Sequence, residues 1–146
     1  MQSGQQFKID QPGLMKAGLI PVIVGAVGGV LWIVIGLEFL GGLVGWLAPL
    51  FAGVWYVMTK RKEGAMPEQM DAIVNGAVLG AVVGLVYGIV ALITAGIAWS
   101  SVTAGLLGAF NPFGISQVIT AIIGGAVAGA VAAFVYMYLV KSGSIK

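Results

Sequence analysis

Few side chains in this sequence could take part in chemistry inside a membrane. Glu38 is the only charged residue in the apolar run from Ala17 to Met58. A carboxylate held in hydrocarbon would be a candidate for a proton relay or a cation site. Asn75 and Tyr87 are polar residues in a second long apolar stretch. Glu38, Tyr87 and Asn75 are therefore the candidate transport or polar site.

Each of these residues also has a purely structural interpretation. Glu38 lies beside Gly41 and Gly42, where we expect a turn between two membrane helices, and a solvated turn residue is the favoured reading. Tyr87 falls about 15 residues into its helix, roughly mid-bilayer at about 1.5 Å per residue. Its hydroxyl needs a partner at that depth, which favours a hydrogen bond between helices. We expect Asn75 and Thr94 to form similar hydrogen bonds between helices.

Glycines at intervals of four residues form the clearest pattern in the chain. A stripe without side chains lets another backbone come close and favours tight crossing of membrane helices. We expect such glycines to pack helices within this chain, or against another copy or a partner subunit. The glycines concerned are Gly76, Gly80, Gly84, Gly88, Gly125 and Gly129.

The densest basic cluster consists of Lys60, Arg61 and Lys62. Such a cluster next to a membrane helix can contact anionic lipid headgroups. Its role in orienting the chain explains the cluster fully, so lipid contact is the less favoured interpretation.

Several kinds of chemistry are excluded by residue type. The chain has no cysteine and no histidine, so the usual ligands of zinc, haem and iron–sulfur clusters are missing. The usual general base is missing as well. Strings that resemble GxGxxG lie inside apolar stretches and do not follow a strand, which excludes a nucleotide-binding loop. The sequence predicts no catalytic residues, no metal, no cofactor and no nucleic-acid partner.

The composition is that of an integral membrane protein. Of the 146 residues, 60% are hydrophobic and 8% are charged, and the mean hydropathy is +1.06. A soluble domain carries about 25% charged residues. The lipid bilayer is therefore the expected surrounding of this chain, and no strand pattern competes with helices.

The elements expected to position these residues are four transmembrane helices, because one span needs about 20 apolar residues. The predicted fold is an all-α bundle of two antiparallel hairpins, between tails at 1–16 and 141–146. Pro21 is expected in the first turn of the first helix, and Pro49 should kink the second. The segment 100–117 is expected to be an interfacial cap or a re-entrant loop. The helices are expected at about 17–37, 40–58, 67–99 and 118–140.

The basic residues predict the orientation. With four spans, all seven Lys and Arg residues fall on one side of the membrane. The positive-inside rule then places both termini in the cytoplasm, and a prokaryotic cytoplasmic membrane is expected.

Four short helices with an early glutamate resemble the small multidrug-resistance transporters, whose glutamate lies within the first helix. Here Glu38 lies at the end of that helix and its neighbours do not match, so we reject that identity. The expected function is a non-catalytic membrane component that packs through small-residue faces, in a homo-oligomer or as an accessory subunit of a larger complex. The alternative is a small oligomeric channel or transporter for an ion or small solute.

Overall fold

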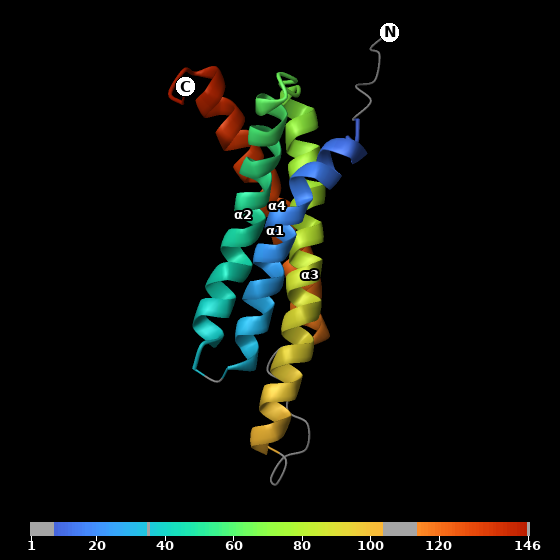
Figure 1. Cartoon of the computed structure of the whole chain (residues 1–146), viewed down its shortest axis with the longest axis vertical. Helices are drawn as coiled ribbons and strands as arrows, with labels where there is room; N and C mark the ends of the chain where they lie inside the picture. Colours follow the sequence, from blue (N-terminus) through green and yellow to red (C-terminus); the bar gives the residue numbers. More distant parts are fainter. Residues whose placement is uncertain (1–7, 35, 104–113, 146) are drawn as a thin grey trace.

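The computed structural model describes residues 8–34, 36–103 and 114–145 (Figure 1). Over these ranges the chain is helical and has no strand. Most of the segment 100–117, expected as an interfacial cap or a re-entrant loop, lies outside the described residues. The elements are α1 (Gln11–Val30), the 3₁₀ turn η1 (Leu31–Ile33), α2 (Glu38–Lys62), α3 (Gln69–Thr103) and α4 (Ile115–Lys141).

Four helices are long and apolar enough to cross a membrane. The candidate spans contain 23, 25, 32 and 27 residues, against about 20 needed for one crossing. The prediction of an all-helical chain with four helices that could span a membrane is confirmed over the described residues.

The first helix begins earlier than expected. Asp10 caps α1, because its Oδ1 accepts a hydrogen bond from the N–H of Gly13 at 3.1 Å. Pro12 then lies in the first helical turn, where a missing N–H leaves no helix bond unmade. Residues 11–16, expected in the tail, are therefore helical. Pro21 lies inside α1 and not in its first turn.

The turn between α1 and α2 lies at Gly36 and not at Gly41-Gly42. Gly36 has a φ of +98°, a backbone conformation that suits glycine. Glu38 is the first residue of α2, and its Oε2 accepts a hydrogen bond from the N–H of Gly36 at 2.7 Å. A carboxylate is favourable at a helix N-terminus, which favours a helix start at this position.

The helices form a bundle with α2 and α3 in its middle. Within the described residues, α2 and α3 each contact all three other helices, whereas α1 and α4 do not contact one another. The side chains between the helices are largely small, and Ala17, Ala52, Ala91 and Ala133 are completely buried. The start of α1, the α2–α3 connection and the end of α4 share one end of the bundle, and the α1–α2 connection lies at the other (Figure 1).

Candidate functional site

The glycines singled out in the sequence lie where α3 meets α4 of the same chain. A Cβ added at Gly80 would overlap the carbonyl oxygen of Gly125, and one added at Gly84 would overlap that of Ala121. In the reverse direction, a Cβ at Gly129 would overlap the carbonyl oxygen of Gly76. Gly88 completes the row, since its Cβ would lie 3.1 Å from the Cα of Val118. The two backbones are therefore in direct contact along this face.

Asn75 is fully buried near the end of the bundle that carries the start of α1. Its Oδ1 accepts a hydrogen bond from the N–H of Asp10 at 2.9 Å. Its Nδ2 donates to the carbonyl of Lys8 at 3.0 Å and to that of Asp71 at 2.7 Å. The side chain thus fixes the segment before α1 against α3.

Asp10 is the centre of a polar cluster that the sequence analysis did not single out. Lys60 Nζ lies 2.8 Å from Asp10 Oδ2, and the hydroxyl of buried Tyr56 donates to the same oxygen at 3.2 Å. The hydrogen bond from Lys60 is the main reason that the pKa of Asp10 lies below its ordinary value, and the N–H of Gly13 lowers this pKa further. The sequence did contain a signal for Asp10, because an aspartate two residues before Pro12 is typical of the start of a helix.

Some residues of the basic cluster at positions 60–62 interact with other side chains of the same chain. Lys60 pairs with Asp10 and lies 3.8 Å from Glu63 Oε2. Lys62 lies over the ring of Trp55, with its Nζ 5.7 Å from the ring centroid. Arg61 lines a shallow hollow with Met58 and Tyr136.

Polar groups deeper in α3 bond toward α1 and η1. Tyr87 is 6% exposed, and its hydroxyl oxygen accepts a hydrogen bond from Trp32 Nε1 at 3.1 Å. The hydroxyl of Thr94 donates to the carbonyl of Gly29 at 2.7 Å. Both side chains therefore link neighbouring helices in the interior of the bundle.

The three residues of the candidate polar site are not brought together. Glu38 lies at the α1–α2 connection, and Asn75 lies near the opposite end of the bundle. Tyr87 is separated from Asn75 by about 18 Å along α3 at about 1.5 Å per residue. These side chains do not form one site.

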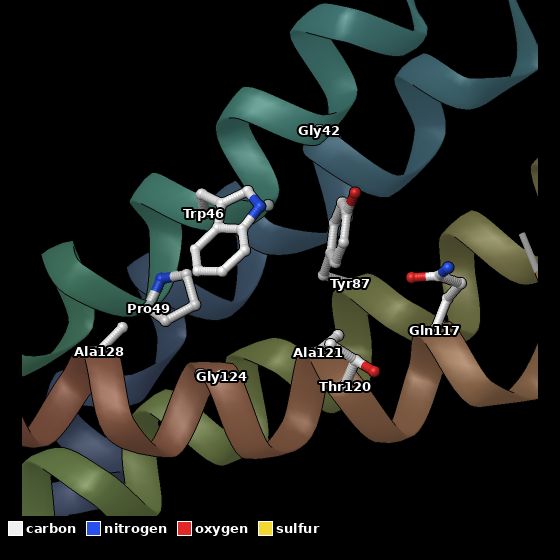
Figure 2. Close-up of a pocket in the computed structure, with 11 residues that line it drawn as sticks. Gly42, Trp46, Pro49, Tyr87, Gln117, Thr120, Ala121, Gly124 and Ala128 are labelled. Carbon is white, nitrogen blue, oxygen red and sulfur yellow. The ribbon is translucent and has the colours of Figure 1, made fainter.

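A recess lies between α2, α3 and α4. It has a volume of about 120 Å³. Figure 2 shows Trp46 and Pro49 on α2 facing the α4 backbone, with the Tyr87 ring from α3 beside them. The lining residues are Gly42, Gly45, Trp46, Pro49, Tyr87, Gln117, Thr120, Ala121, Gly124, Gly125 and Ala128.

Pro49 also affects the backbone hydrogen bonds of α2 beside this recess. Proline has no N–H, so it cannot donate the helical hydrogen bond to the carbonyl of Gly45, one turn earlier. Both residues line the recess. The break that Pro49 is expected to make in the backbone hydrogen bonds of α2 therefore lies in the wall of the recess.

Comparison with known proteins assigns none of these features. No protein-family model, no curated protein and no solved structure matches this chain. Function is therefore inferred from the residues of the chain itself.

Proposed function

We propose that this protein is a non-catalytic component of the membrane that assembles with further copies of itself or with other membrane subunits. The observation that supports this proposal most directly is the use of the buried polar side chains of α3. Asn75, Tyr87 and Thr94 each hydrogen-bond to the segment from Lys8 to Trp32. Polar groups that hold helices together favour a scaffold over a hydrated path, because in hydrocarbon each such group needs a partner.

The glycine row between α3 and α4 is, in this proposal, a glycine zipper that holds the two helices as one hairpin. Support comes from the backbone contacts at Gly76, Gly80 and Gly84, which leave no room for a side chain. Van der Waals contact between close backbones is a main source of helix association in lipid. Because α4 covers this face, assembly with other chains would use the outer surface of the bundle.

The proposed orientation places the end that carries Lys8, Lys60 and Lys141 in the cytoplasm. The basic residues of the described chain gather at this end, and the α1–α2 connection contains none. This distribution supports cytoplasmic termini. In this cysteine-free chain, an impermeant thiol reagent added to intact cells should label Glu38→Cys and spare Lys62→Cys. Labelling of Lys62→Cys alone would show that the protein has the opposite orientation.

The assembly proposal is tested by cross-linking in native membranes, followed by purification in mild detergent and mass determination. We expect cross-linked species heavier than one chain, made of several copies or of this chain with another membrane protein. A strongly denaturing detergent, added before cross-linking, serves as the control and should abolish these species. Recovery of single chains alone, both after cross-linking and in mild detergent, would contradict the proposal.

The alternative of a small oligomeric channel or transporter would need Glu38 to face a water-filled path. Its carboxylate instead accepts a hydrogen bond from Gly36 at the start of α2. This position supports a turn residue, and transport therefore ranks second.

A further inference from the structure

The recess between α2 and α4 opens toward the outside of the bundle. Trp46 is 68% exposed, and Gln117 and Thr120 are also exposed. Since α1 lies on the far side of the α2–α3 pair and does not contact α4 in the described residues, the α1 helix does not cover this opening. In a membrane, lipids of the bilayer can reach an opening on this side of the bundle.

Two glycines in the recess differ from those between α3 and α4. A Cβ added at Gly42 or at Gly124 would meet nothing within 4 Å. Close helix contact therefore does not account for glycine at either position, and each leaves space in the wall of the recess. By contrast, a Cβ at Gly45 would overlap the ring of Tyr87.

The floor of the recess is held in place. The Tyr87 ring packs against Gly45, and the Tyr87 hydroxyl is bound by Trp32 Nε1 at 3.1 Å. A ring fixed at both points cannot easily turn to fill the space in front of it. The recess is thus a preformed feature of the bundle.

The recess changes in polarity along its length. Figure 2 shows Gln117 and Thr120 toward one end, and Pro49 and Ala128 toward the other. The Thr120 hydroxyl donates to the carbonyl of Ser116 at 2.9 Å, so its oxygen can still accept a hydrogen bond. The Gln117 amide, in the first turn of α4, can donate one.

The stretch of α4 that lines the recess is about as long as one leaflet of a bilayer is thick. From Gln117 to Ala128, α4 rises about 16 Å at about 1.5 Å per residue. Half of a hydrocarbon core of about 30 Å is about 15 Å. The polar end of the recess therefore falls near the headgroup region and its apolar end near the bilayer centre.

We propose that this recess binds one fatty acyl or isoprenoid chain of a membrane lipid, from the leaflet on the side of the α1–α2 connection. An oxygen where the chain joins the glycerol accepts a hydrogen bond from Gln117, and the chain runs past Gly124 toward Ala128. The cavity of about 120 Å³ is too small for a helix, whose diameter with side chains is about 10–12 Å. A single hydrocarbon chain is narrow enough to lie along the recess, with part of it in the cavity and the rest in the bilayer at the open side.

The test uses a phospholipid with a photoactivatable group in its acyl chain, reconstituted with the full chain in vesicles. After illumination, mass spectrometry maps the labelled peptides. We expect labelling to concentrate on residues 42–49 and 117–128. Gly124→Phe, which fills the recess, should lower labelling there several-fold. Val127→Phe, a matched change on the exposed face of α4, should leave it unchanged.

Three outcomes would overturn the proposal. The first is equal labelling along all exposed apolar faces, including Ile89 to Ile97 of α3. The second is a folded Gly124→Phe variant, or Gly42→Phe if the first does not fold, that labels like the wild type. The third is a disulfide between two copies of Ala128→Cys in native membranes, because the recess would then be a contact between proteins. None of these outcomes depends on whether the chain assembles through its other faces.

Discussion

Asn75 accepts a hydrogen bond from the backbone N–H of Asp10, 65 residues away in sequence, at 2.9 Å. Asp10 in turn binds Lys60 and Tyr56 of α2 through its carboxylate. This pair of residues therefore joins α1, α2 and α3 at one end of the bundle.

Asn75→Ala should destabilise the protein, because it removes the hydrogen bonds of a buried side chain and leaves the part-buried N–H of Asp10 and the carbonyl of Lys8 without this partner. An unsatisfied buried polar group costs about 1–3 kcal/mol. The measurement is thermal unfolding in detergent, with Met70→Ala, on an exposed position of the same helix, as the control. An unfolding temperature equal to that of the wild type would show that water replaces these bonds.

Acidification should weaken the Asp10 junction. The pKa of Asp10 is lowered in the folded protein, chiefly by the hydrogen bond from Lys60, below the value of 3.8 expected for an unperturbed carboxyl. The contribution of Asp10 to the free energy of unfolding is therefore fully present above pH 3.8 and is lost as the pH falls through the lower, folded pKa. The effect should be small, since this pair is partly solvated.

The measurement compares unfolding of the wild type and Asp10→Asn from neutral pH downward. The difference between the two proteins should shrink as the pH falls, because Asn cannot titrate. Other carboxylates titrate in both proteins and cancel in the comparison. A difference that stays constant down to the lowest pH would argue against an ionised Asp10 in the cluster.

Gly80→Leu should be far more harmful than Gly124→Leu, although both replace a glycine by leucine in a membrane helix. A side chain at Gly80 would meet the backbone of Gly125, and overpacking costs about 1–3 kcal/mol, occasionally more. Gly124 has open space in front of it. Thermal unfolding of the two variants, with Gly80→Ala as a milder change, measures the difference. Equal stability of Gly80→Leu and Gly124→Leu would mean that α3 and α4 do not touch at this face.

Glu38→Gln should leave any ion flux into vesicles unchanged. The amide oxygen of glutamine can still accept the hydrogen bond from Gly36, so the start of α2 is preserved. Flux of protons and cations into vesicles should be compared for the wild type and the variant, with empty vesicles as the baseline. A wild-type cation flux that this single change abolishes would make the protein a transporter and refute the proposed function.

The sequence alone was sufficient for the class of fold and the number of long helices. Long apolar runs with few charges cannot be covered in water, and a bilayer of fixed thickness divides them into spans of about 20 residues. The positions of the helix ends were harder to predict from the sequence. The cap by Asp10 and the turn at Gly36 depend on single hydrogen bonds and one φ value, which hydropathy does not encode.

Only the tertiary structure decided which neighbour each small or polar residue meets. The spacing of Gly76 and Gly80 shows that a helix face lacks side chains, but a backbone of this chain, another chain or lipid could each lie against it. The close approach of Gly125 and Gly129 identifies α4 as that neighbour. The partners of Asn75 and the recess beside Gly124 likewise depend on contacts between segments far apart in sequence. The periodicity of a sequence describes the surface of one helix, whereas packing depends on the two helix surfaces that meet.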